Sequence, residues 1–318
     1  MAGDDASPKT GVVYLARGAD DGALADFGRF VACYSNFPAG LDHQLVIALK
    51  GFAQKTDIGE AKQLFGKLDC TFIDVDDGSY DIGAYVEAAH QVECEFVCFL
   101  NTRSELLAND WLKLLDYHLH RQGTGMVGAS GSFESLESPG FVGPSFPNPH
   151  LRSNAFAIGR ELFLRALDGR AIRDKLDAYH VESGARSLTR AMMSEGLEVR
   201  VVGRNGRAYP PQSWPMSGTY RQGAQENLLV HDRQTRTFEA ASVREKLRLM
   251  SLAWGNYVDT SDFVWDEQVT PDDQPGQSEH LQRGDRHDET PAPIANEAQL
   301  LNDLVADVPG QDQDEVRL

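Results

Sequence analysis

The chain has 318 residues, of which 41% are hydrophobic, 25% charged and 9% aromatic, and this composition is typical of globular proteins with one large domain or two small ones. The formal net charge is −18, so the composition lacks the basic excess of nucleic-acid-binding proteins and nucleic acid is not an expected partner. Residues 259–318 contain 16 acidic residues and three arginines, a net charge of −13, so most of the acidity lies near the C-terminus.

The sequence contains no recognisable membrane or secretion signal. MAGDDASPKT at the N-terminus has neither the positive charge nor the apolar region of a secretory signal, and no apolar run reaches the roughly 20 residues that cross a bilayer. Cys33, Cys70, Cys94 and Cys98 lie in apolar stretches without CxxC spacing, and we expect them to be reduced and buried. These features predict a cytoplasmic protein, with peripheral membrane association as an open alternative.

Strands and helices are expected to alternate through the first part of the chain. Apolar runs predict strands at 11–18, 43–52, 70–77, 94–100 and 125–133, and helical periodicity predicts helices at 20–34, 56–68, 82–91 and 109–122. This alternation is typical of an α/β fold with a mostly parallel sheet flanked by helices.

After Pro149 the pattern changes. We expect a strand and a helix within HLRSNAFAIGRELFLRAL, one helix across HVESGARSLTRAMMSEG, and a strand at 197–203. Residues 204–236 follow as a long irregular segment, and long loops beside an α/β sheet are usually functional or mobile.

The chain is predicted to have three parts: a polar lead at 1–10, a domain at 11–258 with halves at 11–133 and 134–258, and an acidic tail at 259–318. From about Asp266 the tail is rich in Pro, Gln, Asp and Glu, which predicts disorder. Within it, the apolar spacing of 294–308 fits both a short docking helix and a fraying helical stretch without a partner. The tail is a candidate for docking another protein, although charge runs are usually solvated and inert.

Polar residues follow several of the expected strands, at the edge where open parallel sheets bind ligands. They are Arg17, Lys50, the run Asp74–Asp77 and the run NTRSE at 101–105. Turn formation or helix capping explains any one of them more simply. Their presence at so many strand ends favours a ligand site.

Four stretches carry a resemblance to a known family: FVCFLNTRSELLANDWLKLL, HLRSNAFAIGRELFLR, HVESGARSLTRAMMSEGLEVRVV and DDGSYDIGAYVEAA. The first is similar to the strand that ends in the Asp-x-Asp motif of GT-A nucleotide-sugar glycosyltransferases of the broad family 2 type. The second and third resemble that family's return into the second half of the sheet and its acidic helix and strand. The fourth resembles a segment of rhamnan-synthesis-type members. The resemblance covers roughly residues 11–258 and implies a GT-A-like, Rossmann-like fold.

The resemblance implies a glycosyltransferase of polysaccharide biosynthesis that moves a sugar from a UDP-, dTDP- or GDP-linked donor to a glycan or lipid-linked acceptor. An inverting displacement is expected, with Glu182 as the general base and Arg103 at the leaving diphosphate. Capping of a helix that starts near Ser183 is the alternative for Glu182, and a surface position is the alternative for Arg152. The other implied positions are donor contacts at Arg17, Asp77, Asp81, Asn101 and Ser104, and acceptor or diphosphate contacts at Arg152, His231 and Asp232, with Gln225 and Asn227 in the same segment.

The position of the Asp-x-Asp motif reads Asn101–Ser104, with no carboxylate before Glu105. A divalent cation such as Mn²⁺ or Mg²⁺ prefers carboxylate oxygens, whereas the Arg103 guanidinium would neutralise a diphosphate directly. Metal-independent transfer therefore competes with a cation held through Glu105, Asp232 or His231.

Two other functions compete with glycosyl transfer. A catalytically degenerate GT-A domain would bind a nucleotide or carbohydrate without turnover, which the missing Asp-x-Asp motif suggests. A sugar-phosphate nucleotidyltransferase is less favoured, because LARGADDGALADF after the first strand lacks the expected Gly-rich basic loop.

Overall fold

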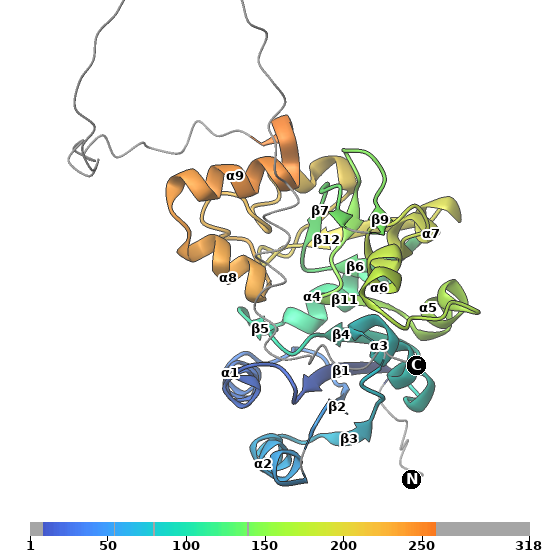
Figure 1. Cartoon of the computed structure of the whole chain (residues 1–318), viewed down its shortest axis with the longest axis vertical. Coiled ribbons are helices and arrows are strands. Elements are labelled where there is room, and N and C mark those ends of the chain that lie inside the picture. Colours follow the sequence, from blue (N-terminus) through green and yellow to red (C-terminus); the bar gives the residue numbers. More distant parts are fainter. Residues whose placement is uncertain (1–8, 54, 79, 139, 259–318) are drawn as a thin grey trace, which may run out of the picture. The chain divides into compact units, whose positions relative to one another are not determined.

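The computed structural model describes residues 9–53, 55–78, 80–138 and 140–258 (Figure 1). The chain divides into two units, one comprising 1–136 and 140–263 and the other 137–139 and 264–318. In the second unit the described residues form the short strand β8 (Glu137–Ser138). The acidic tail at 259–318, with its predicted helix at 294–308, lies outside the described residues.

The first unit is built on an eight-stranded sheet in the order β13-β12-β6-β11-β4-β1-β2-β3. Strand β1 pairs in parallel with β2 and β4, and β2 with β3, whereas β11 runs antiparallel to β4 and β6. The strands are β1 (Thr10–Arg17), β2 (Gln44–Lys50), β3 (Thr71–Asp74), β4 (Phe96–Leu100), β6 (Thr124–Gly128), β11 (Ala155–Gly159), β12 (Glu198–Val202) and β13 (Ala208–Tyr209). The predicted fold class, an α/β fold with a mostly parallel sheet, is confirmed.

Helices cover both faces of this sheet, because side chains along each strand alternate between two cores. Val12 and Tyr14 face one core and Val13 and Leu15 the other. The first core is covered by α1 (Ala23–Asn36), α2 (Lys55–Phe65) and α4 (Trp111–Leu119), and the second by α3 (Asp81–Gln91), α5 (Arg160–Leu167), α6 (Lys175–Glu182) and α7 (Leu188–Ser194) (Figure 1).

Short strands and two further helices complete the unit. The small strands are β5 (Glu105–Leu106), which pairs with β14 (Val230–His231), β7 (Gly131–Ser132), which pairs with β10 (His150–Leu151), and β9 (Phe141–Val142). The remaining helices are α8 (Arg233–Ala240) and α9 (Val243–Trp254) and the 3-10 turns η1 (Pro211–Met216) and η2 (Gly255–Tyr257). No helix in the described ranges is long and apolar enough to cross a bilayer.

The single helix predicted across 180–196 is wrong, because the chain breaks there into two helices. Helix α6 ends at Glu182, and α7 begins after Ser187, whose side chain caps it by accepting from the Arg190 amide. At Gly184 a Cβ would lie 2.7 Å from the His180 carbonyl oxygen, so the turn passes directly over the helix it leaves. Glu182 therefore ends one helix, and the alternative that it caps the start of the next is also wrong.

Helix α8 begins inside the segment at 204–236 that was predicted to be irregular, and α9 lies in the last part of the predicted domain, for which no element was predicted. Asp232 begins α8 through a capping box with Thr235, and the Ser242 side chain accepts from the Glu245 amide at the start of α9. Ser followed three residues later by Glu is a recognisable start signal, so the sequence contained a cue for α9.

Candidate functional site

The candidate site lies at the carboxyl ends of β1, β2 and β4. Arg17 and Lys50 are the last residues of β1 and β2 and are register partners. Two residues earlier on each strand, Leu15 and Ala48 belong to the core beneath α3. Because side chains alternate along a strand, Arg17 and Lys50 project toward the same face. Two basic groups thus lie near the start of α3.

Acidic residues surround these two bases, and together they form a strand-end cluster of Arg17, Asp20, Lys50, Asp77 and Asp81. The Arg17 guanidinium binds Asp20 Oδ1 at 2.7 Å and Asp77 Oδ1 at 3.1 Å. Lys50 is 2% exposed, and burial lowers its pKa although Asp77 and Asp81 act in the opposite direction. The cluster is a partly enclosed set of hydrogen-bond donors and acceptors.

Gly51, directly after β2, allows Asp77, which follows β3, to approach closely within this cluster. Gly51 has a φ of +61°, a conformation that residues with a side chain rarely adopt. A Cβ at Gly51 would lie 2.7 Å from Asp77 Oδ1. The glycine therefore holds Asp77 close to the end of β2 and within reach of Arg17.

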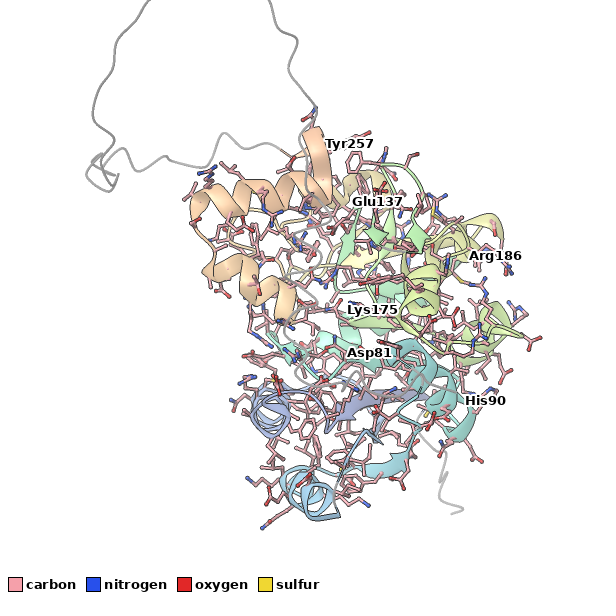
Figure 2. The ribbon with its side chains drawn as sticks, viewed as in Figure 1. Asp81, His90, Glu137, Lys175, Arg186 and Tyr257 are labelled. Carbon is pink, nitrogen blue, oxygen red and sulfur yellow. The ribbon has the colours of Figure 1, made fainter. Side chains whose placement is uncertain are left out.

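Asp81 is the first residue of α3 and is labelled in Figure 2. The pKa of Asp81 is raised to about 6, chiefly by burial and in addition by Asp20 and Glu182, and Lys50 and Arg17 oppose this shift. Asp81 thus lies near the carboxylates of Asp20 and Glu182, and its pKa lies not far below neutral pH.

In the turn after β4, the side chains of Asn101 and Ser104 form hydrogen bonds that stabilise the turn, and the side chain of Arg103 is partly exposed. Asn101 Oδ1 accepts from the Arg103 amide and from Ser104 Oγ, both at 3.1 Å. Ser104 is 2% exposed and also donates to the Asn154 carbonyl at 3.0 Å. The Arg103 side chain remains partly exposed, with Nε 3.9 Å from Asp20 Oδ2. The structure thus brings Arg103 to the strand-end cluster and places Asn101 and Ser104 in the turn that carries it.

Glu182 is half-buried at the end of α6, and its Oε2 accepts a short hydrogen bond from Ser153 Oγ. Its charge raises the pKa of Asp81 and opposes the lowering that burial causes at His150. Glu182 is therefore an electrostatic neighbour of the strand-end cluster. Ser153, which orients it, belongs to the turn between β10 and β11 and was not among the predicted site residues.

Beside Ser153, Arg152 forms a buried ion pair with Asp232, with 2.7 Å between Nη2 and Oδ2. The guanidinium carbon also lies 4.3 Å from the centre of the Tyr220 ring, a cation–π distance. Burial alone would raise the pKa of Asp232, but Arg152 and the Thr235 amide outweigh it, and the pKa stays below its usual range. The prediction of a surface arginine as the alternative for Arg152 is wrong, because its side chain is 10% exposed.

Two buried donors on this turn have no hydrogen-bond partner within the described chain: Arg152 Nη1 and Asn154 Nδ2. The two oxygens of Asn154 have partners, since its Oδ1 accepts from Ser130 Oγ and its carbonyl from the Asn101 amide and Ser104. A buried N–H without a partner costs free energy, so a ligand oxygen placed here would be bound favourably. Sequence analysis missed Asn154.

The predicted metal ligands do not form a ligand set. Glu105 and His231 face each other across β5 and β14, but Glu105 Oε2 binds Arg236 at 3.2 Å and Asp232 binds Arg152. Within the described ranges, no group of three or more His, Cys, Asp or Glu residues has the geometry to hold a metal ion. These residues therefore do not fit the divalent cation that the resemblance implied.

Gln225 and Asn227 organise the loop that carries them. Gln225 accepts from the Arg221 amide and donates to the Thr235 carbonyl, and Asn227 Nδ2 donates to the Ser217 carbonyl at 2.7 Å. These contacts tie η1 and its following turn to α8, and so support the segment that positions Asp232.

Comparison with known proteins gives distant structural neighbours. No protein-family model and no curated protein sequence matches the chain. Similar solved structures include a 4-diphosphocytidyl-2C-methyl-D-erythritol synthase from Anaerococcus prevotii, with 13% identity, a TM-score of 0.41, and coverage of 61% of this chain and 88% of that one. A mannosyltransferase from Pyrobaculum calidifontis in complex with GDP-Man and Mn²⁺ has 13% identity, a TM-score of 0.41, and coverage of 68% and 61%. Mouse xyloside xylosyltransferase 1 has 12% identity, a TM-score of 0.39, and coverage of 61% and 84%.

These neighbours thus include two sugar transferases, and a further similar structure is that of a cytidylyltransferase from Leptospira borgpetersenii. At TM-scores near 0.4, this likeness assigns no function by itself. The likeness to family 2 and to rhamnan-synthesis members stays a prediction.

Proposed function

We propose that the chain is a glycosyltransferase that moves a sugar from a nucleotide-sugar donor to a hydroxyl acceptor with inversion at the anomeric carbon. The observation that carries the proposal is the position of Glu182. Its carboxylate is oriented by Ser153 and is an electrostatic neighbour of Asp81. It also adjoins the turn with the donors of Arg152 and Asn154 that have no partner among the described residues.

Glu182 is suited to act as the general base. Oε2 is taken by the Ser153 hydroxyl, and no hydrogen bond joins Oε1 to another part of the described chain. Oε1 would accept the proton of the acceptor hydroxyl while the acceptor oxygen bonds to the anomeric carbon and the bond to the diphosphate oxygen breaks. A positioned base of this kind contributes about 10²–10⁴-fold to the rate.

The strand-end cluster is the proposed donor site. Asp77 and Asp81 offer acceptors to ribose hydroxyls, and Arg17 and Lys50 offer positive charge beside them. Arg103 would stabilise the negative charge that develops on the leaving nucleoside diphosphate, because a guanidinium pairs well with phosphate oxygens. Since Glu105, His231 and Asp232 do not fit a cation, the proposed step uses Arg103 for that charge.

The test compares E182Q with the wild type across UDP-, dTDP- and GDP-linked sugars. Transfer of the sugar to water serves as the first readout, because it needs no identified acceptor. We expect kcat to fall by about 10²–10⁴-fold while the Kd for the nucleoside diphosphate stays within a factor of about two. E195Q, a change at a carboxylate paired with Arg165 on the surface, is the matched control and should retain wild-type turnover.

Three results would contradict parts of the proposal. Full turnover by E182Q would remove Glu182 as the base. Nucleotide binding by a wild-type protein that turns over no donor would favour the binding-module alternative. Binding of no nucleotide sugar would overturn the donor site itself.

A further inference from the structure

A second polar site lies on the other side of the sheet edge, between α1 and α8. It is a cavity of 590 Å³ beside the turn after β4. Helices α1 and α8 and the intervening β5 lie on the same side of Figure 1. We name it the arginine pocket; its lining is Arg29, Arg103, Arg233 and Arg236, with Asp21, Asp26 and the small residues Gly22, Ala25, Thr237 and Ala240.

The arginines outnumber the acidic groups of the pocket lining. Asp26 is buried and binds Arg29, and its oxygens lie 3.8 Å from Arg236 Nη2 and 4.0 Å from Arg103 Nε. Glu105, outside the lining, binds Arg236. The Arg103 guanidinium is within ion-pair range of Asp20 and Asp26, but those distances are too long for hydrogen bonds. Asp26 thus lies within ion-pair range of three guanidinium groups but forms a hydrogen bond with only Arg29 among them.

The residue types that line the pocket favour binding of an anion over binding of a base or a lipid chain. It contains no aromatic ring and no large apolar side chain, so it offers neither a stacking surface for a base nor an apolar contact for a lipid chain. Guanidinium groups match phosphate oxygens through paired N–H donors, and the small residues leave room for such a group.

Asp20 separates this pocket from the proposed donor site. Its Oδ1 binds Arg17 in the strand-end cluster, whereas its Oδ2 faces Arg103. A negative side chain between two groups of bases favours two separate anion positions over one continuous groove.

We infer that the arginine pocket binds a phosphate or diphosphate group of a ligand other than the donor nucleotide. The group comes from a phosphorylated sugar or from the headgroup of a lipid diphosphate, since both present the same oxygens. The pocket shares Arg103 with the proposed transfer step, but its other arginines, Arg29, Arg233 and Arg236, have no part in that step. Its test therefore uses variants of those three arginines and does not depend on Glu182.

Calorimetric titration of the full chain with inorganic pyrophosphate tests the site. We expect saturable binding that is at least about ten-fold weaker in the double variant R233Q/R236Q and also weaker in R29Q, since each lost charge-assisted contact weakens binding. R165Q, which removes an exposed arginine of α5 paired with Glu195, is the matched control and should bind as the wild type does. Thermal melts of every variant confirm folding.

Wild-type affinity for pyrophosphate in both R29Q and R233Q/R236Q would overturn the inference. Competition between pyrophosphate and a saturating nucleoside diphosphate would also overturn it, because the pocket would then be part of the donor site. Separate titrations with a hexose 1-phosphate and with a short-chain prenyl diphosphate distinguish the two sources. Binding of either that weakens in R233Q/R236Q supports the site and names its ligand class, and binding of neither contradicts it.

Discussion

Arg152 and the arginine pocket lie at the same sheet edge but differ in how closely carboxylates pair with their positive charges. Arg152 is buried against one carboxylate, Asp232, and one aromatic ring, with 2.7 Å between the charged atoms. In the arginine pocket, four arginines line an open cavity and share carboxylates, several at distances too long for hydrogen bonds.

This difference indicates that the charge of Arg152 contributes to the stability of the fold, whereas the charges of the pocket arginines contribute little to it. A buried ion pair leaves a large penalty when one partner is removed, because the other cannot be solvated. Partly exposed arginines are solvated when a partner is lost, so their pairing contributes little to stability. We therefore expect Arg152 and Asp232 to hold the turn that carries Ser153, and the pocket arginines to serve a ligand.

The largest effect is expected from D232N. Asn is as good a helix N-cap as Asp, so this change keeps the start of α8 and removes the charge that faces Arg152. The free energy of unfolding should fall by roughly 3–5 kcal/mol, measured by urea denaturation. D174N, at the exposed N-cap of α6, is the control and should lose under about 0.5 kcal/mol. Equal losses in both variants would mean that the buried pair carries no special stability.

A smaller effect, dependent on pH, is expected at Asp81. Its folded-state pKa of about 6 lies above the value of about 3.9 for an unfolded aspartate. The folded state therefore binds more protons between pH 4 and 6, and stability is lost as the pH rises through that window.

D81N removes this titration. Relative to D81N, the wild type should lose up to about 2 kcal/mol of unfolding free energy between pH 4 and 7, measured by denaturation at each pH. D77N changes a carboxylate of the same cluster and is the control, and its profile should keep the wild-type slope. Identical profiles for D81N and the wild type would show that Asp81 titrates as an ordinary surface carboxylate.

Local patterns predicted the half of the fold that repeats strand and helix. Each predicted element from 11 to 122 overlaps one in the structure, because apolar periodicity and burial agree there. The pattern failed at 180–196, where the continuous helical periodicity hid a break at Ser183–Ser187. It also failed at α8, which is polar, begins inside the segment expected to be irregular and depends on a cap at Asp232. No element was predicted for α9, although Ser242 and Glu245 mark its start.

The candidate site was harder to predict because it depends on contacts between distant segments. Strand ends identified Arg17 and the turn at Arg103, since parallel strands bring their carboxyl ends to one edge. No local pattern shows that Asp232 would face Arg152, or that the Asn154 amide would be buried without a partner. The pairing of Arg236 with Glu105 likewise follows from the antiparallel approach of β14 to β5, which the sequence did not indicate.

The smallest effect on stability is expected from a substitution in the arginine pocket. It is the most direct test of the difference between the pocket and the Arg152–Asp232 pair. Arg236 is 29% exposed on its side chain and lies against Glu105 and Asp26. R236Q should change the free energy of unfolding by less than about 1 kcal/mol, because Arg29 still pairs with Asp26 and water replaces the lost contacts. Urea denaturation measures this in the same experiment as D232N. A loss as large as that of D232N would mean that the pocket arginines hold α8 against α1. A small loss together with weakened pyrophosphate binding would show that the two arginine sites have different roles, one in the fold and one in binding.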